Sequence, residues 1–269
     1  MVDQRAEQRA PELRAPEQRA PDVSLYDVIL RRRDVRREFT GDPVDRTILR
    51  RVLEAAHAAP SVGLTQPWDF VVITDPGIRR AFHAHVQAER SRFAETLEGE
   101  RAQTFAGIKI DGVLEASLNV VMTYDPARGA PSVLGRHSIS DAGLYSVCLA
   151  AENLWLACTA EGWGMGWVSF FQESFVSELL GIPDPVRPVA WLCMGPVSKL
   201  ADTPDLERHG WRERLPLEDV LHADTWMGTA AGPGLVAADG QTRQTNGGRT
   251  RASTVKGGQG APLVGGRLT

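Results

Sequence analysis

The clearest hydrophobic pattern lies between residues 141 and 160, where the spacing predicts a long helix. Apolar side chains recur there at i, i+3, i+4 and i+7, which is the pattern of a buried helical face. They are Leu144, Val147, Cys148, Ala151, Leu154, Trp155 and Cys158. Gly162 is placed to end the helix, because glycine readily adopts the left-handed conformation that follows a helix C-terminus. The helix is more apolar than one small subunit can bury, so it also predicts a homodimer.

Shorter patterns predict the other elements. Ser24 and Asp45 are candidate N-caps of two helices, and the second helix stops before Pro60. A loop rich in turn-forming residues follows at 60–68. Apolar runs predict strands at 68–74, 118–124, 166–171 and 188–195, and helical segments are expected at 76–103 and 173–181.

The order of these elements indicates the fold class. Helices and strands interleave, which favours an α+β or mixed α/β class in which helices flank a central mixed sheet. No Gly-x-Gly-x-x-Gly follows a predicted strand, and the sequence has no Walker motif. These absences argue against a dinucleotide-binding Rossmann unit and against a P-loop nucleotidase.

Both ends of the chain differ in composition from its centre. Residues 1–22 repeat a short unit that contains proline and arginine, which predicts a disordered N-terminal arm. Residues 228–269 are rich in glycine and lack an apolar pattern, which predicts a disordered tail. The expected working domain is therefore 23–227.

The composition limits the possible functions. The chain has 269 residues and is 42% hydrophobic, and its net charge of −4 argues against a nucleic-acid partner. No apolar run reaches the length of about 18 residues that crosses a bilayer, so no membrane partner is expected. The absence of a signal-peptide pattern favours the cytoplasm. The three cysteines are expected to be buried thiols, and the histidines lack zinc-ligand spacing, so no metal site is predicted.

The main chemical signal is the segment RRRDVRREF at 31–39, in which five arginines surround one carboxylate, Asp34. One or two arginines at this place offset the macrodipole of the preceding helix, but five such charges repel each other. A bound phosphate relieves the repulsion, because guanidinium groups bind phosphate oxygens in pairs. Arg212 and Arg214 are placed to complete such a site. The residues alone therefore indicate a domain that binds a phosphorylated small molecule.

Six segments in this order resemble the nitroreductase flavoprotein family, and within it the BluB branch of 5,6-dimethylbenzimidazole synthases. They are RRRDVRREF, AAHAAPSVGLTQPWDFVVI, VLGRH, NLWLACTAEGWGMGWVSFF, LLGIPDPVRPVAWLCMGPV and GWRERLPLEDV, and they span residues 24–226. The resemblance implies a homodimer with FMN at the subunit interface. The residues that it assigns to the FMN site are Arg32, Arg33, Arg36, Ser61, Gly63, Gln66, Gly135, Arg212 and Arg214.

Two departures from the ordinary nitroreductase pattern match the BluB branch. Asp34 stands where those enzymes usually have serine, and Leu64 stands where they commonly have an asparagine that can bind the flavin. Ser169 also matches the branch. The resemblance implies that Asp34 is a catalytic base, kept ionised by its arginine neighbours, and that Ser169 relays its proton or orients the flavin ring.

By this resemblance, reduced FMN is the substrate and O2 the co-substrate. The products are 5,6-dimethylbenzimidazole, the lower ligand of cobalamin, and D-erythrose 4-phosphate. A separate flavin reductase using NAD(P)H is a possible source of the reduced FMN. Two alternatives stay open at this point: an NAD(P)H-dependent nitro- or flavin reductase that retains its FMN, and a flavin carrier without catalysis.

Overall fold

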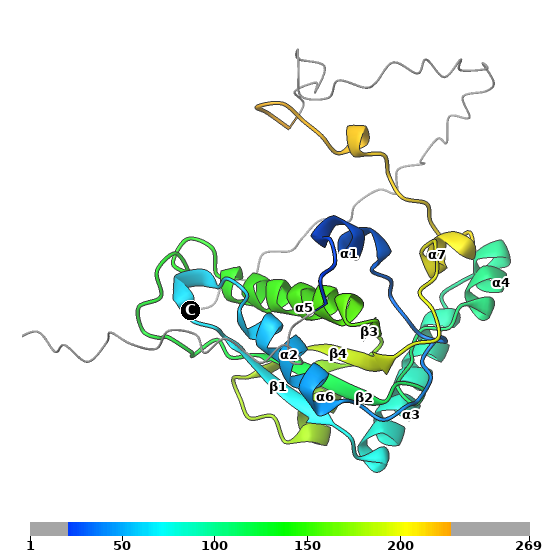
Figure 1. The fold of residues 1–269 in the computed structure, drawn as a ribbon, viewed down its shortest axis with the longest axis horizontal. Helices are drawn as coiled ribbons and strands as arrows, with labels where there is room; N and C mark the ends of the chain where they lie inside the picture. Colours follow the sequence, from blue (N-terminus) through cyan, green and yellow to red (C-terminus); the bar gives the residue numbers. More distant parts are fainter. Residues whose placement is uncertain (1–20, 227–269) are drawn as a thin grey trace, which may run out of the picture. The chain divides into compact units, whose positions relative to one another are not determined.

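The computed structural model describes residues 21–226, and Figure 1 shows its helices and strands. The chain divides into two units, Met1–Arg214 and Leu215–Thr269. The described part of the second unit contains the 3-10 turn Leu217–Asp219. The predicted N-terminal arm lies almost entirely outside the described residues, and the predicted glycine-rich tail lies wholly outside them.

The elements of the first unit follow the predicted order closely. Its helices are α1 (Leu25–Arg31), α2 (Arg46–His57), α3 (Pro76–Ala94), α4 (Gly99–Gly107), α5 (Ala142–Ala160), α6 (Glu173–Leu180) and α7 (Asp205–Arg208), with a 3-10 turn, η2, at Val62–Leu64. Its strands are β1 (Trp68–Ile73), β2 (Leu118–Tyr124), β3 (Trp163–Val168) and β4 (Arg187–Pro196). The stretch 76–103 contains two helices rather than one. The strand predicted at 166–171 begins earlier, at Trp163, and ends at Val168.

The four strands form one sheet in the order β1-β2-β4-β3. Each pair of neighbouring strands is antiparallel, so the α+β class is confirmed and the prediction of a mixed sheet is wrong. An interleaved pattern fixes the order of elements, but it does not fix the direction in which each connection returns the chain. The described residues contain one parallel pairing, an isolated bridge between Asp34 and Met165 of β3.

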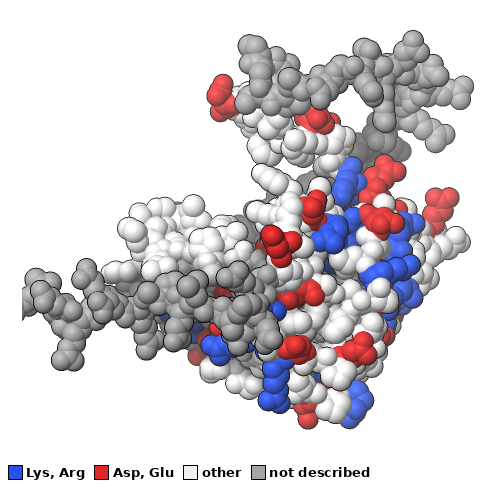
Figure 2. Space-filling model, viewed as in Figure 1, with Lys and Arg blue, Asp and Glu red and all other residues white. Residues whose placement is uncertain are grey.

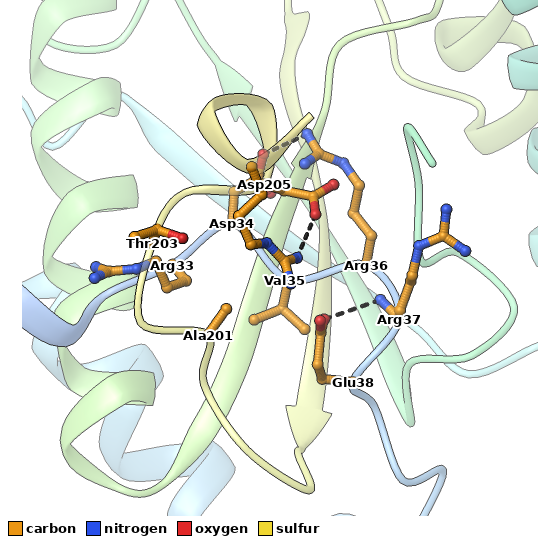
Figure 3. A pocket seen from close by; sticks show the side chains of 10 residues that line it. Arg33, Asp34, Val35, Arg36, Arg37, Glu38, Ala201, Thr203 and Asp205 are labelled. Atoms are coloured by element: carbon orange, nitrogen blue, oxygen red, sulfur yellow. Dashed lines mark hydrogen bonds and ion pairs between the residues drawn. The ribbon is translucent and has the colours of Figure 1, made fainter. Parts of the chain in front are cut away.

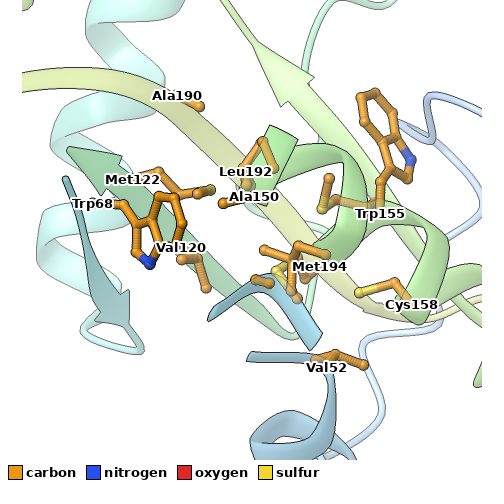
Figure 4. Packing of buried hydrophobic residues seen from close by; sticks show 14 of the residues in the cluster. Val52, Trp68, Val120, Met122, Ala150, Trp155, Cys158, Ala190, Leu192 and Met194 are labelled. Atoms are coloured by element: carbon orange, nitrogen blue, oxygen red, sulfur yellow. The ribbon is translucent and has the colours of Figure 1, made fainter. Parts of the chain in front are cut away.

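Helices cover both faces of the sheet (Figure 1), so there are two hydrophobic cores, one on each face. Successive residues of the fully buried strand β2 alternate between these two cores. Leu118, Val120 and Met122 pack in the core that contains α2 and α5, whereas Val121 packs in the core that contains α3 and α4. Figure 4 shows part of the first core, in which Val52 of α2 lies near the buried side chains of the sheet and of α5. Burying one large aliphatic side chain contributes about 1.5–3 kcal/mol, so these two cores dominate the stability of the unit.

Local sequence explains where several helices begin and end. The Asp45 carboxylate accepts hydrogen bonds from the backbone N–H groups of Thr47 (2.7 Å) and Ile48 (3.3 Å), which confirms the predicted N-cap of α2. Such a cap contributes about 1 kcal/mol. Gly162, with φ of 76°, follows the end of α5 as predicted. Ser24 precedes α1 but makes no side-chain capping bond.

Two further observations bear on the sequence predictions. Cys158 and Cys193 are buried, but Cys148 is exposed, so the prediction that all three thiols are buried is wrong. Cys148 lies on a face of α5 that is exposed in the described part of this chain. Within the described residues, no helix has the length and apolar character needed to cross a membrane.

Candidate active site

The arginine-rich segment leaves α1 and runs alongside β3. A backbone hydrogen bond joins the segment to this strand, from the N–H of Val35 to the carbonyl oxygen of Met165, at 2.9 Å. Gly164 and Gly166 make this approach possible, because a Cβ on Gly166 would lie 2.2 Å from the Val35 carbonyl oxygen. The alternating glycines of β3 therefore give the segment that carries Asp34 its place beside the sheet.

Asp34 is held by β3 and by its arginine neighbour. The backbone N–H of Trp167 donates to Asp34 Oδ1 at 3.1 Å, and Arg36 donates to Asp34 Oδ2, the contact drawn as a dashed line in Figure 3. Burial nevertheless raises the pKa of Asp34 above its ordinary value, although Arg36 and the Trp167 N–H both act to lower it. The arginines favour the ionised carboxylate, as expected, but desolvation outweighs them, so the net shift of the pKa is upward.

The arginines have different environments. Arg32 lies over the ring of Trp155 of α5, with its guanidinium carbon 4.7 Å from the ring centroid, and its Nε is 3.7 Å from Glu152. Arg33 donates to backbone carbonyl oxygens, among them that of Asp202. Burial, followed by Arg214 and Arg32, lowers the pKa of Arg33.

Two guanidinium N–H groups in this cluster lack acceptors. Arg33 Nε and Arg36 Nε are buried and have no hydrogen-bond partner among the described residues. A buried donor of this kind is costly unless a ligand or water accepts its hydrogen bond. The two arginines line a narrow cleft together with Asp34, Ala201 and Thr203, as Figure 3 shows.

A larger hollow of about 260 Å³ also has Arg36 in its lining. Apolar and aromatic side chains form most of its lining, and Arg36, Trp167 and Ser169 complete it. The remaining residues of the lining are Phe93, Phe105, Ile108, Ile110, Phe170, Leu206 and Trp211. The structure thus brings Ser169 and the Asp34–Arg36 pair to one region, since Trp167 contacts both the hollow and Asp34.

Figure 2 shows how charge is distributed over one face of the molecule. Lys and Arg atoms, with Asp and Glu atoms among them, gather on the side where Figure 1 labels α7 and α4. Arg212 and Arg214, which follow α7, are both exposed. Arg214 lies near enough to Arg33 to affect its pKa. Arg214, one of the two arginines that follow α7, is therefore electrostatically coupled to the arginine cluster around Asp34.

The other predicted cofactor residues form a second group, in the loop around η2. Ser61 Oγ accepts a hydrogen bond from the backbone N–H of Gln66 at 2.9 Å, which closes the loop. Gly63 has φ of 56°, and a Cβ there would lie 2.9 Å from Val133, while a Cβ on Gly135 would lie 3.4 Å from Val62. Leu64 and Gln66 also have positive φ, at 52° and 45°. Such strain in residues other than glycine is typical of ligand-binding loops.

The two groups contact α5 at separate places. The loop donates from the backbone N–H of Val62 to Ser146 Oγ at 3.1 Å, whereas Trp155 Nε1 donates to the Arg33 carbonyl oxygen at 3.0 Å. Ser146 and Trp155 are nine positions apart, so they lie about 14 Å apart along the helix axis. The arginine cluster and the η2 loop of this chain therefore lie at separate places along α5.

Sequence reasoning missed the residues that place Asp34. The backbone N–H of Trp167 and the two glycines of β3 carry no titratable side chain, so a search for reactive groups passes over them. Their signal was the alternation of glycine in WGMGW, which marks one strand face as open to another backbone.

Comparison with known proteins decides the family. The model of the nitroreductase family matches residues 29–196. This chain belongs to the nitroreductase family. The 5,6-dimethylbenzimidazole synthase of Rhodobacter capsulatus is 38% identical to this family member over 196 residues, which cover 72% of this chain and 93% of that protein. The 5,6-dimethylbenzimidazole synthase of Rhodospirillum rubrum is also 38% identical, over 186 residues that cover 69% of this chain and 87% of that protein.

A solved structure shows the same nitroreductase fold. The structure of oxidized iodotyrosine deiodinase bound to FMN and 3-iodo-L-tyrosine has a TM-score of 0.58 at 21% sequence identity. The match covers 72% of this chain and 97% of the deiodinase chain. At this identity the similarity supports the nitroreductase fold alone.

Proposed function

We propose that this nitroreductase-family protein is a 5,6-dimethylbenzimidazole synthase, which uses O2 to fragment reduced FMN into 5,6-dimethylbenzimidazole and D-erythrose 4-phosphate. The observation that carries the proposal is the 38% identity to the Rhodobacter capsulatus synthase over 93% of its length. The placement of Asp34 supports it, because a carboxylate held against β3 by the Trp167 N–H is a base that simple hydride transfer to a flavin does not require.

The residues present fit FMN. The buried, unpartnered Nε atoms of Arg33 and Arg36 are suited to phosphate oxygens, and Arg214 adds a third positive charge. The aromatic hollow beside Arg36 suits a flat ring system, since its lining is apolar apart from Arg36 and Ser169. When bound, reduced FMN supplies both the electrons for O2 and the carbon atoms of the product.

The protein then has to hold the substrate and move protons. We assign Asp34 the role of base, and its raised pKa makes it a stronger proton acceptor than an exposed aspartate. The Trp167 N–H and Arg36 fix its two oxygens, so the carboxylate cannot rotate away. Ser169, two residues beyond Trp167, is exposed at the hollow and serves as proton relay or ring-orienting partner.

We further propose that the working form is a homodimer in which the η2 loop of one subunit completes the arginine cluster of its partner. Exposed apolar side chains on α1 and α5 support this arrangement, because patches of this kind mark interfaces. They are Leu25, Tyr26, Ile29, Leu30, Tyr145 and Leu149. Light scattering should give twice the subunit mass of 29.4 kDa, and Leu149→Arg should shift the protein to monomer. A dimer that resists this change would place the interface elsewhere.

Aerobic incubation with chemically reduced FMN, followed by mass spectrometry, tests the function. We expect equal amounts of 5,6-dimethylbenzimidazole and D-erythrose 4-phosphate, with loss of FMN. A parallel reaction with NADH and oxidised FMN tests for a reductase, which would oxidise NADH and leave FMN intact. FMN that survives both reactions would exclude the synthase.

A further inference from the structure

The segment 169–172 leaves β3 with Ser169 and enters α6, and one stripe of α3 contacts its residues 170–172. The contacting residues of α3 are Phe82, His85, Glu89 and Phe93, which are three or four positions apart and so share one helical face. This stripe belongs to neither the arginine cluster nor the η2 loop. It lies behind the residue that the proposed chemistry uses.

Aromatic contacts hold the two phenylalanines that follow Ser169. The ring centroids of Phe93 and Phe170 are 5.7 Å apart, and those of Phe82 and Phe171 are 5.9 Å apart. Phe82 is fully buried and is itself stacked on Trp191 of the sheet, with centroids 3.5 Å apart. The backbone beyond Ser169 is thereby tied to the core.

Polar contacts hold the next residue, Gln172, by both its backbone and its side chain. Its backbone N–H donates to His85 Nε2 at 3.1 Å, and its side-chain Nε2 donates to Glu89 Oε1 at 3.1 Å. The imidazole also stacks on Phe175 of α6, with ring centroids 3.9 Å apart. The side chains of His85 and Glu89 are only 12% and 17% exposed, whereas Gln172 itself is exposed, so the two acceptors supply the buried half of these contacts.

The bond to the imidazole requires neutral histidine. A protonated ring carries a hydrogen on Nε2, which would face the donor N–H of Gln172 instead of accepting from it. The charged groups nearby on α3 are Glu89, 3.8 Å away, and Arg92, which itself donates to Glu89. On α6, Phe175 is uncharged and Glu173 pairs with Arg187.

We infer that His85 is a positioning residue for Ser169, which it holds through Gln172 while the imidazole is neutral. The inference rests on the role given to Ser169 in the proposed function. Burial lowers the pKa of His85, and Arg92 acts in the same direction, whereas Glu89 opposes them. The lowered pKa favours the neutral ring at neutral pH, and acidification below that pKa protonates Nε2 and breaks the contact.

Three variants test the role of His85. His85→Gln retains a hydrogen-bond acceptor, the amide oxygen, which does not titrate. His85→Leu removes the acceptor and fills the same space with an apolar side chain. His83→Gln is the matched control, because His83 lies on the same helix but contacts Asp111 rather than the 169–172 segment. FMN affinity should stay within about twofold of wild type in all three, since none touches the arginine cluster.

The first measurement is amide hydrogen exchange of the peptide that covers 170–175. One hydrogen bond protects by a factor of about five to ten, so His85→Leu should exchange faster by that factor, and His85→Gln should resemble wild type. An unchanged rate in His85→Leu, or an equal acceleration in His83→Gln, would overturn the inference.

The second measurement is product formed per bound FMN between pH 5.5 and 8. His85→Leu should fall about tenfold at pH 7.5, while His85→Gln retains the wild-type yield there and loses the part of the acid decline that His85 causes. Superimposable profiles of wild type and His85→Gln would overturn the role of the imidazole. If wild type makes no dimethylbenzimidazole but the exchange pattern holds, the proposed function fails and the contact of His85 with this segment stands.

Discussion

Gly166→Ala is predicted to displace Asp34 without changing any titratable group. The added Cβ would lie 2.2 Å from the Val35 carbonyl oxygen and 3.3 Å from Asp34 Oδ1. Because carbon and oxygen atoms that are not bonded rarely come closer than about 3.4 Å, the segment 34–35 has to retreat from β3 by about 1 Å. That retreat breaks the bond from Val35 N to the Met165 oxygen, now 2.9 Å, and the bond from Trp167 N to Asp34, now 3.1 Å.

The expected cost follows from these two losses. Overpacking a close contact costs about 1–3 kcal/mol, and each lost hydrogen bond about 1 kcal/mol. Since relaxation of the segment relieves part of the overlap, the free energy of unfolding of the FMN-free protein should fall by about 2–4 kcal/mol. A misplacement of about 1 Å at the base should also lower product per bound FMN by about a hundredfold.

Urea unfolding of the FMN-free protein and product assays on the loaded protein measure these two effects. Gly107→Ala is the matched control, because a Cβ there would meet only atoms of His209, at 3.9–4.0 Å. Its free energy of unfolding should stay within about 0.5 kcal/mol of wild type. If Gly166→Ala unfolds at the same urea concentration as wild type and gives the same yield, the close approach of the segment to β3 is not present in solution.

Three further predictions concern the charged residues. Asp34→Asn should keep FMN affinity within about twofold but give oxidised FMN and hydrogen peroxide instead of dimethylbenzimidazole. The control Asp42→Asn, at an exposed position, should retain the full product yield. A normal yield from flavin-loaded Asp34→Asn would refute the catalytic role of Asp34. Folding raises the pKa of Asp34, so the contribution of this residue to the free energy of unfolding is complete below about pH 4 and is lost as pH rises through the folded pKa. In urea unfolding, Asp34→Asn should therefore gain stability relative to wild type from pH 4 to 7. A difference that stays constant with pH would contradict the raised pKa. Arg33→Ala should weaken FMN binding about ten- to a hundredfold in a fluorescence titration, because a charge-assisted hydrogen bond contributes about 1.5–3 kcal/mol. The control Arg31→Ala should bind FMN as tightly as wild type. Equal FMN affinities of the two variants would place the phosphate site elsewhere.

The elements that the sequence predicted well are those in which local chemistry decides. Helix α5 has an unbroken apolar spacing and a glycine after its end, and Asp45 supplies a cap that the structure contains. The start of β3 was missed because glycine has low strand propensity, yet Gly164 and Gly166 lie in the strand so that another backbone can approach. Strand direction was missed because it depends on how distant segments return, which no local pattern contains.

The candidate site was predictable in its membership but not in its arrangement. The arginines around Asp34 stand out in the sequence because their mutual repulsion needs an explanation. Burial of Asp34, by contrast, depends on β3 and Arg36 together, so the direction of its pKa shift required the structure. The separation of the η2 loop from the arginines likewise depends on where each contacts α5.

That separation has a consequence for mixtures of damaged subunits. In the proposed homodimer, one active centre takes its arginines from one chain and its η2 loop from the other. A chain damaged at Arg33 and a chain damaged at Gly63, each inactive alone, would then form a heterodimer with one centre built from two intact halves and one built from two damaged halves. Random reassociation of equal amounts yields half heterodimers, each with one of its two centres restored, so about a quarter of wild-type activity should return. Two copies of this one gene, each with a different defect, would in this way rescue each other inside one cell.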